Sequence, residues 1–196
     1  MLKQIKYSFL FAIILISCIS EQGGSRKNKS ELLENFFQKN PNYISDGFDF
    51  PIGKPNATGY YNAQEFQSSK GHLGEDWNNA TREDMGDPVF AASNGIVTYA
   101  SYVSIGWGNV VIISHKLPEG IFVETLYGHL EKVRVYEGNF IHRGDNIGTI
   151  GDADGAYSPH LHFELRDDLT LSVGHGYGDS KGYLHPTRFI KANRKF

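Results

Sequence analysis

The sequence predicts a mainly β fold, an antiparallel β-sheet or partial barrel with long loops around a groove. From residue 88 onward, short stretches with many β-branched and aromatic residues alternate with turn signals at hairpin-like intervals. The 22 glycines and the 13% of aromatic residues suit a turn-rich β protein better than a helical one. At 196 residues, the chain has the length of one domain with tails.

Residues 1–17 have the pattern of a bacterial signal peptide. Two lysines precede an almost unbroken apolar run from Tyr7 to Ile16, which is shorter than the roughly 20 residues that a membrane span needs. The run closes as Leu-Ile-Ser-Cys, which resembles a lipobox, and an ordinary signal peptide with an incidental cysteine is the alternative. Cys18 is the only cysteine, so it has no intramolecular disulfide partner, and we expect it to be lipidated.

Residues 18–49 are expected to form a tether that contains one short helix. Ser20–Lys29 is polar and contains glycine and serine, as a linker would. Ser30–Phe37 has a helical pattern in which the Ser30 hydroxyl is placed to cap the first turn. The domain itself is expected at residues 50–196, and its first part, residues 51–71, shows no clear period.

Seven strands are predicted in the rest of the domain, each bounded by turn residues. They cover residues 88–92, 95–103, 109–115, 121–130, 140–141, 146–150 and 160–166. No amphipathic helix longer than two turns is visible after Phe37. We therefore expect the function to be carried by one face of the sheet and by its loops.

The charge pattern argues against a nucleic-acid partner. The formal net charge is −3, and no long basic run occurs before the short C-terminal stretch 191–196. Proteins that bind nucleic acid through electrostatics usually carry a basic patch or stripe. We therefore expect no nucleic-acid partner.

The clearest chemical pattern among the eight histidines is Pro-His-Leu-His-Phe-Glu at residues 159–164. Residues two apart in a strand face the same side at a Cα distance of roughly 6.6 Å. His160 and His162 should therefore share a face, where one imidazole could bind a metal and the other could lie beside the substrate. Two solvent-facing histidines on an amphipathic strand are the alternative. Glu164 has the same phase and is expected either to support this site or to lie at the surface.

A second pattern, His-Leu-Gly-Glu-Asp at residues 72–76, supplies two further groups that bind zinc. A fully extended strand would place His72 and Asp76 about 13 Å apart, so the chain must bend between them. Together with His162 they make three nitrogen and oxygen donors, a set typical of catalytic zinc, which keeps a fourth position open. A cysteine-rich structural zinc site is excluded, because Cys18 is the only cysteine.

The other histidines are less informative by themselves. His129 lies in Tyr-Gly-His-Leu (127–130) at the end of a predicted strand, where a lone histidine is more often structural than catalytic. His115 ends another apolar strand, and we expect it to be structural. The remaining three histidines lie in no recognisable pattern.

In order, these motifs resemble those of the lysostaphin-type zinc endopeptidases of bacterial cell walls. HLGED, YGHL and PHLHFE stand in the order of that family, and no required motif residue is missing. Further segments resemble it as well: GDPVFAASNGIVTYA (86–100), GNVVIISH (108–115), RGDNIGTIGDADG (143–155) and HPTRF (185–189). The resemblance covers roughly residues 50–190.

The resemblance implies a zinc ion held by His72, Asp76 and His162, with His129 and His160 as catalytic histidines beside it. It implies hydrolysis of the peptide crosslinks of peptidoglycan. The motifs lack the glutamate base of H-E-x-x-H proteases, so one of the two histidines must act as base, and the sequence does not say which. We expect a monomer in the cell envelope, held by its N-terminal lipid to a bacterial membrane on the periplasmic or outer face.

Two other functions are compatible with these motifs. A catalytically silent lipoprotein would hold wall peptides in the groove and regulate another hydrolase, whereas a zinc amidase would cut the bond between the lactyl group and the peptide. The stretch Asp167–Leu184 departs from the family, because it is longer and richer in Gly and Tyr. It could form one wall of the groove, with Tyr177 and Tyr183 as contacts, or it could be a solvated loop.

Overall fold

The computed structural model describes residues 26–174 and 176–195, so the predicted signal peptide and Cys18 lie outside the described residues. The helical elements are α2 (Arg26–Lys39), α3 (Pro186–Ala192) and two short helical turns, η1 (Pro41–Tyr43) and η2 (Gly53–Ala57). The strands are β1 (Tyr60–Gln64), β2 (Glu75–Asn79), β3 (Pro88–Phe90), β4 (Gly95–Ser104), β5 (Gly108–Lys116), β6 (Phe122–Val133), β7 (Phe140–Ile141), β8 (Asn146–Ile150), β9 (Leu161–Arg166) and β10 (Tyr183–Leu184).

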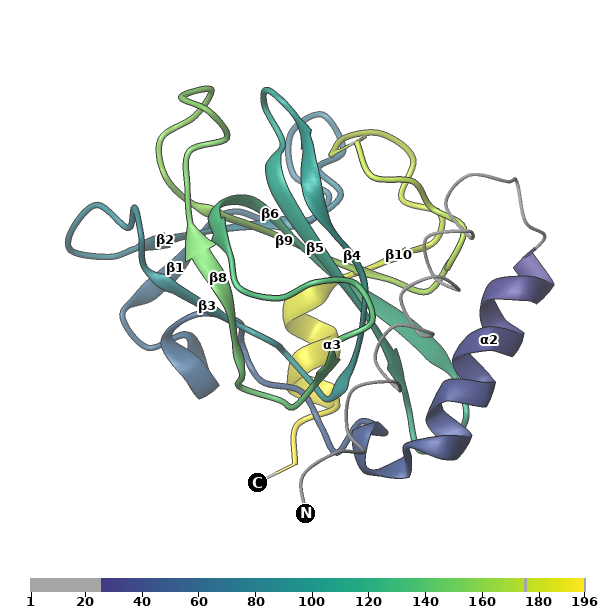
Figure 1. Ribbon diagram of the computed structural model, residues 1–196. Helices are drawn as coiled ribbons and strands as arrows, with labels where there is room; N and C mark the ends of the chain where they lie inside the picture. The colour runs from purple at the N-terminus through teal and green to yellow at the C-terminus, as the bar shows by residue number, and fades with distance from the viewer. Residues whose placement is uncertain (1–25, 175, 196) are drawn as a thin grey trace, which may run out of the picture.

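The described strands form one antiparallel sheet (Figure 1). Its main path runs β1-β2-β9-β6-β5-β4-β7, while β10 pairs with β9, and β8 pairs with β3 and β6. All seven predicted strands are present, so the prediction of a mainly β, antiparallel fold is confirmed. Three strands were not predicted, and one of them, β1, lies in the stretch expected to be irregular. β1 is an edge strand of polar and tyrosine residues that alternate between half-buried and exposed, so it has no apolar pattern to read.

The two helices cover opposite faces of the sheet. Ile96 and Val97 are neighbours on β4 and therefore point to opposite faces. Ile96 packs in a cluster with Leu33 and Phe37 of α2, whereas Val97 belongs to the larger core, which includes Ile190 of α3. Figure 1 shows α2 at the right of the view and α3 near its middle. The helical part of the predicted tether thus contacts the sheet.

Helix α2 is longer than the sequence predicted. It covers Arg26–Lys39, so Ser30 lies inside the helix and the prediction that Ser30 caps its first turn is wrong. The residues just before Ser30 are Arg, Lys and Asn, which can continue a helix without apolar periodicity. Within the described part of the chain, no helix is long and apolar enough to cross a membrane.

The segment between β9 and β10 follows the α2 face of the sheet towards the strand ends that carry the histidines. Leu169 is buried in the cluster under α2, and the Lys29 ammonium donates a hydrogen bond of 2.9 Å to the Leu169 carbonyl oxygen. Val173 packs on a second apolar cluster, formed by Val110, Ile112 and Leu126. The segment is therefore anchored to the sheet at Leu169 and Val173, while many of its other described residues, among them 177–179, are exposed.

Candidate metal centre

Strand register brings distant motifs into one row across the sheet. β2 pairs with β9 so that Asp76 lies opposite His162, and β9 pairs with β6 so that His162 lies opposite Gly128. Residues directly opposite each other in paired strands project from the same face. Asp76 and His162 therefore meet on one face, and His129 follows Gly128 at the same end of β6. The sequence separated these groups by up to 86 positions, and the antiparallel pairing joins them.

Two glycines leave the space that His162 occupies. A Cβ atom on Gly128 would lie 3.2 Å from the ring of Trp107 and 3.4 Å from the Cβ of His162. A Cβ atom on Gly74 would lie 2.8 Å from Cε1 of His162 and 2.7 Å from the carbonyl oxygen of Phe163. Larger residues at these positions would push His162 out of place, which explains the glycines in both motifs.

His72 reaches this row from the turn before β2. Gly71, with a φ of +69°, turns the chain just ahead of it, as only glycine does at little cost. The backbone of His72 then forms an isolated antiparallel bridge with Tyr177, and the next N–H, that of Leu73, donates to the Gly176 carbonyl oxygen at 2.8 Å. The predicted bend is present, and the β9–β10 segment holds one side of it.

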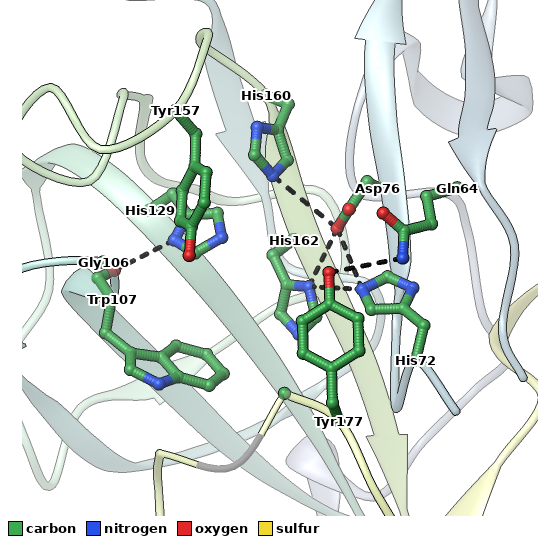
Figure 2. Close-up of a pocket in the computed structure, with 11 residues that line it drawn as sticks. Gln64, His72, Asp76, Gly106, Trp107, His129, Tyr157, His160, His162 and Tyr177 are labelled. Carbon is green, nitrogen blue, oxygen red and sulfur yellow. Dashed lines mark hydrogen bonds and ion pairs between the residues drawn. The ribbon is translucent and has the colours of Figure 1, made fainter. Parts of the chain in front are cut away.

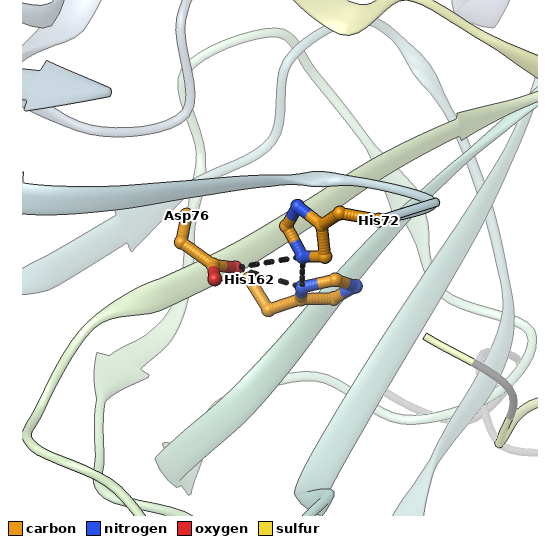
Figure 3. A group of neighbouring side chains, drawn as sticks. All are labelled: His72, Asp76 and His162. Carbon is orange, nitrogen blue, oxygen red and sulfur yellow. Dashed lines mark hydrogen bonds and ion pairs between the residues drawn. The ribbon is translucent and has the colours of Figure 1, made fainter. Parts of the chain in front are cut away.

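The three predicted donors converge on one point (Figure 3). Nε2 of His72 lies 3.2 Å from Nδ1 of His162, and Oδ1 of Asp76 lies 3.3 Å from the first nitrogen and 2.8 Å from the second. In a tetrahedral zinc site with bonds of roughly 2.0–2.2 Å, two donor atoms lie about 3.3–3.6 Å apart. The shortest spacing, between Nδ1 of His162 and Oδ1 of Asp76, would have to widen by only about 0.5 Å for zinc to fit. The three donors therefore fit zinc.

The charges around His162 favour a cation at this point. Burial by itself disfavours the imidazolium form, but hydrogen bonds to the carboxylates of Asp76 and Glu164 outweigh it and raise the pKa of His162 to about 9. Burial also tends to raise the pKa of Asp76, yet hydrogen bonds from His162 and His72 lower that pKa far below its ordinary value. Two ionised carboxylates thus flank one imidazole.

His129 and His160 line the other side of the same pocket (Figure 2). Nδ1 of His129 lies 3.2 Å from the carbonyl oxygen of Trp107, and Nδ1 of His160 lies 2.8 Å from that of Ser158. Because a carbonyl oxygen only accepts, each Nδ1 must donate, and Nε2 of each neutral ring is left as a proton acceptor. The two rings lie 4.7 Å apart, and Nε2 of His160 is 3.7 Å from Oδ1 of Asp76.

His129 is held in a strained and buried position. Its φ of +63° lies in the left-handed region, which costs a residue with a side chain of the order of 1–3 kcal/mol and is common at functional sites. Burial, together with the nearby imidazoles of His162 and His160, lowers the pKa of His129 to about 3. His129 is therefore neutral at any ordinary working pH.

The match to a family model covers this whole arrangement. The model described as peptidase family M23 matches residues 70–186, a range that contains the three donors and both further histidines. This chain belongs to peptidase family M23. Peptidases of this family are zinc enzymes, in agreement with the His-Asp-His donor set.

Relatives of this M23 chain include cell-wall enzymes. The DD-carboxypeptidase/endopeptidase Mpg of Neisseria meningitidis serogroup B is 41% identical over 82 residues, which are 42% of this chain and 18% of that protein. The peptidoglycan DD-endopeptidase ShyC of Vibrio cholerae serotype O1 is 35% identical over 96 residues, which are 49% of this chain and 20% of that protein. This chain thus spans about a fifth of the length of these curated relatives.

A solved structure supports the fold. The antimicrobial peptidase lysostaphin from Staphylococcus simulans superposes with a TM-score of 0.54 and 24% sequence identity. The superposition covers 68% of this chain and 50% of that chain. The lysostaphin-like fold expected from the sequence is therefore confirmed for this M23 member.

Two aromatic residues at the M23 pocket were not predicted. The ring of Trp107 lies 5.8 Å from that of His129 and 5.3 Å from that of His162. The ring of Tyr157 lies 5.3 Å from that of His129. Trp107 follows Gly106 at the tip of the β4–β5 hairpin, and a tryptophan in such a turn, next to an apolar strand, is the one signal that the sequence offered.

The two tyrosines predicted as groove contacts have different positions. Tyr177 lies at the pocket, with its ring 5.2 Å from that of His72 and its hydroxyl oxygen accepting a hydrogen bond of 3.3 Å from the amide of Gln64. The prediction for Tyr183 is wrong, because Tyr183 is buried. The guanidinium of Arg166 lies over its ring, 5.3 Å from the ring centre. Pairing of β10 with β9 sets Tyr183 opposite Arg166, four positions beyond His162 along β9, so Tyr183 shares the face of the pocket but lies beyond its lining.

The two glutamates of the motifs are both fully buried. Glu75 accepts hydrogen bonds from the backbone N–H and hydroxyl of Thr187, at 3.2 and 2.7 Å, and lies 3.1 Å from Nδ1 of His185. It thus fixes the start of α3, which accounts for the closing HPTRF segment. Glu164 accepts a hydrogen bond of 3.0 Å from Nε2 of His162, so it supports a donor, and the surface alternative is wrong.

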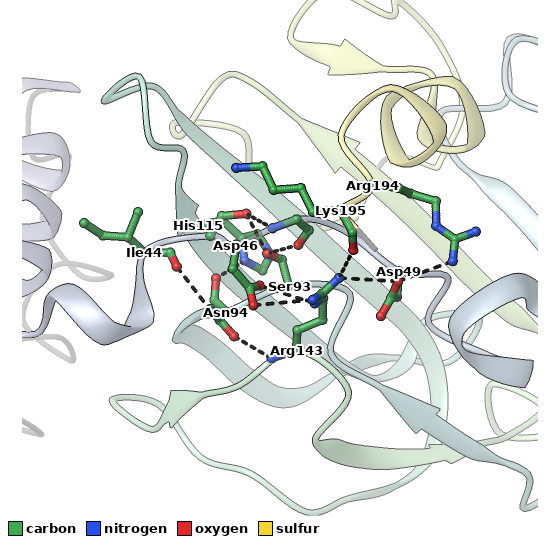
Figure 4. Close-up of polar contacts among 11 residues, drawn as sticks. Ile44, Asp46, Asp49, Ser93, Asn94, His115, Arg143, Arg194 and Lys195 are labelled. Atoms are coloured by element: carbon green, nitrogen blue, oxygen red, sulfur yellow. Dashed lines mark hydrogen bonds and ion pairs between the residues drawn. The ribbon is translucent and has the colours of Figure 1, made fainter.

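His115 lies away from the pocket, in a polar network near Asn94 and Arg143 (Figure 4). Its Nδ1 donates to the carbonyl oxygen of Asn94, and its Nε2 lies within hydrogen-bond distance of the Thr125 hydroxyl oxygen, both at 2.8 Å. The side chain of Asn94 in turn donates to the Ile44 carbonyl oxygen and accepts from the backbone N–H of Arg143. Burial lowers the pKa of His115 to about 4, so this histidine is neutral and structural, as predicted.

Proposed function

We propose that this chain is a zinc-dependent endopeptidase that hydrolyses peptide bonds in peptidoglycan. The proposal rests on one observation: two sets of side chains face each other across one pocket. Three donors spaced for zinc lie on one side, and two histidines with an accepting Nε2 lie on the other. The relative ShyC, which is named a peptidoglycan DD-endopeptidase, supports the substrate class.

The donors His72, Asp76 and His162 would hold the ion. Bound zinc supplies a Lewis acid that polarises a peptide carbonyl and lowers the pKa of a water molecule from about 15.7 towards 7. The donors contribute one negative charge, so the site keeps a net charge of about +1. The Asp76 carboxylate stays ionised over the whole working range, because its pKa is held low.

His129 and His160 move the protons. His129 is neutral, with Nδ1–H held by Trp107, so it enters the reaction as an acceptor at Nε2. His160 has the same tautomer and lies nearer to Asp76, with 13% of its side chain exposed. One of them takes the proton of the attacking water, and the protonated ring then gives a proton to the leaving amine. Positioned acid–base groups of this kind contribute roughly 10²–10⁴-fold to a rate.

The rim of the pocket suits an extended peptide. Tyr157 and Tyr177 are about half exposed and lie near opposite groups of the site, Tyr157 against His129 and Tyr177 against His72 (Figure 2). Aromatic rings of this kind offer large contact area at low conformational cost, with a hydroxyl for polar backbone groups. A peptide that crosses between them would place one bond over the three donors.

We further propose that lipid on Cys18 holds the mature chain, as a monomer, to a bacterial membrane in the cell envelope. The lipobox-like sequence and the polar stretch after it support this. Two or more acyl chains anchor a protein firmly, whereas one holds it only weakly. Cys18→Ala protein should leave the detergent phase on phase separation, and its persistence there would contradict the anchor.

The proposal is tested on purified peptidoglycan incubated with the zinc-loaded chain and analysed by mass spectrometry. Crosslinked fragments should be converted to smaller ones with the gain of one water, with new amino groups and an intact lactyl–alanine bond. His129→Ala protein is the matched control, which should bind zinc and cleave the crosslinks roughly 10²–10⁴-fold more slowly. Release of whole stem peptides would indicate an amidase, and binding to the wall without any cleavage would indicate a silent lipoprotein. Either result would overturn the proposal.

A further inference from the structure

Glu164 is a buried carboxylate that lies outside the set of three donors, yet contacts one donor residue. It follows His162 by two positions on β9, so both side chains lie on the same face of the sheet. Nδ1 of His162 faces Asp76 at 2.8 Å, while Nε2, on the far side of the ring, donates to Oε1 of Glu164 at 3.0 Å. The ring is thus held at both ends.

Arg166 fixes the other oxygen of this carboxylate. Its Nε donates to Oε2 of Glu164 at 2.7 Å, and one terminal nitrogen lies 2.5 Å from the same oxygen. The guanidinium is fully buried and lies 5.3 Å from the ring of Tyr183. A buried carboxylate between an imidazole and a guanidinium has each oxygen committed to one donor group, so it cannot turn freely.

The second imidazole donor has no such support. Nδ1 of His72 is buried and, among the described residues, has no hydrogen-bond partner. A ring whose far N–H is held by a carboxylate must present the lone pair of its other nitrogen, whereas an unheld ring can adopt either tautomer. The orientation of the donor set therefore depends on His162 more than on His72.

We propose that Glu164 is a positioning residue for His162, and that Arg166 keeps Glu164 in place. By accepting from Nε2–H, the carboxylate selects the tautomer whose Nδ1 lone pair points at the shared point of the three donors. The inference rests on the zinc site of the proposed function and adds two residues to it. Loss of such a supporting hydrogen bond costs roughly 10–100-fold in metal affinity.

Glu124 provides a matched control on the neighbouring strand. It is also fully buried, and it lies opposite Arg166 in the pairing of β6 with β9. Its Oε1 accepts from the hydroxyl of Ser114 at 2.5 Å and pairs with the ammonium of Lys29 at 3.0 Å. Neither of these partners is a metal donor, so Glu124→Gln perturbs a buried carboxylate of the same face without touching His162.

Zinc affinity and stability are to be compared for the wild-type chain, Glu164→Gln and Glu124→Gln. The amide in Glu164→Gln would offer one acceptor oxygen where the carboxylate offers two, so either His162 or Arg166 would lose its partner. We expect zinc binding, measured by competition with a chelator, to be roughly 10–100-fold weaker in Glu164→Gln and changed by less than about 3-fold in Glu124→Gln. Both variants should unfold at lower urea concentration than the wild type.

Three outcomes separate the explanations. Equal zinc affinity of Glu164→Gln and wild type would overturn the inference, as would equal losses in both variants, which would mean general destabilisation. Absence of zinc binding by the folded wild type would instead overturn the proposed function. If Glu164→Gln does not fold, Glu164→Asp replaces it: the charge for Arg166 is kept, but the shorter side chain should fail to hold Nε2, with the same loss of affinity.

Discussion

Two histidines of this protein, His162 and His115, are buried to a similar degree and have hydrogen-bond partners at both ring nitrogens. Their pKa values nevertheless shift in opposite directions. His162 lies between the carboxylates of Asp76 and Glu164, which raise its pKa to about 9. His115 lies between a carbonyl and a hydroxyl oxygen, and burial lowers its pKa to about 4. Burial alone therefore does not set the pKa of a histidine; the charge of its hydrogen-bond partners decides the direction of the shift.

The surroundings of the two histidines extend this contrast. Around His162, a row of groups from three strands leaves Nδ1 beside two other donor atoms within reach of one ion. Around His115, both ring nitrogens have uncharged hydrogen-bond partners, the carbonyl oxygen of Asn94 and the hydroxyl of Thr125. The first region can therefore hold a cation, whereas the second holds a neutral imidazole.

The largest effect is expected from removal of a donor. Asp76→Ala and His162→Ala should each lose the zinc, since two remaining donors are too few to hold it, and peptidoglycan cleavage should fall to background. His115→Gln should keep one zinc per chain. Metal analysis of the purified proteins measures this, and full occupancy in either donor variant would mean that the assignment of donors is wrong.

The next effect is expected from the two proton-handling histidines. His129→Ala and His160→Ala should keep the zinc and the fold, while cleavage of crosslinked fragments slows by roughly 10²–10⁴-fold. Initial rates and metal content are measured on the same samples. Loss of zinc from one of these variants would mean that the replaced histidine is a zinc ligand, which contradicts its assignment as a proton-handling residue.

A moderate effect is expected on the pH dependence of stability. His115 has a folded pKa of about 4 and an ordinary value of 6.5, so the unfolded chain binds the proton more readily. The stability that its neutral form provides is complete above pH 6.5 and is lost as the pH falls towards 4, by about 3 kcal/mol. Urea unfolding at several pH values should show that the free energy of unfolding falls less between pH 6.5 and pH 4 in His115→Gln than in the wild type. His142→Gln, at an exposed position, is the control and should follow the wild type.

The smallest effect is expected at the rim. Tyr177→Ala should lower kcat/KM for a crosslinked fragment by a few-fold to about tenfold, as loss of an aromatic contact worth about 0.5–1.5 kcal/mol implies. Tyr177→Phe keeps the ring over His72 and loses only the hydroxyl bond to Gln64, so it should stay close to the wild type. Equal losses in both variants would assign the effect to the hydroxyl instead of the ring.

The sequence predicted most strands, because turn residues bound them, and strand alternation placed His160 and His162 on one face. The resemblance of three motifs to a known family added His72, Asp76 and His129, which meet them in the pocket. It did not predict β2, since the strand Glu-Asp-Trp-Asn-Asn buries charged groups and has no apolar alternation. It misplaced Tyr183, because the register of β10 with β9 decides how far along β9 that side chain lies.

The hydrogen-bond partners of individual ring nitrogens could not be predicted from the sequence either. The tautomers of His129 and His160 depend on the carbonyl oxygens of Trp107 and Ser158, whose positions follow from turns without a distinctive pattern. The burial of Glu164 depends on Arg166, and an arginine in a strand is ordinarily exposed. Such details arise from tertiary packing, which local patterns do not encode.

Zinc should bind between His72, Asp76 and Nδ1 of His162 while the hydrogen bonds of His115 stay unchanged. Nitrogen-15 NMR of the histidine rings during a zinc titration follows both sites in one experiment. We expect that, at one zinc per chain, the Nδ1 signal of His162 shifts while its Nε2 keeps a proton, and that both signals of His115 stay in place. Coordination of His162 through Nε2, or a shift at His115 with none at His162, would contradict it.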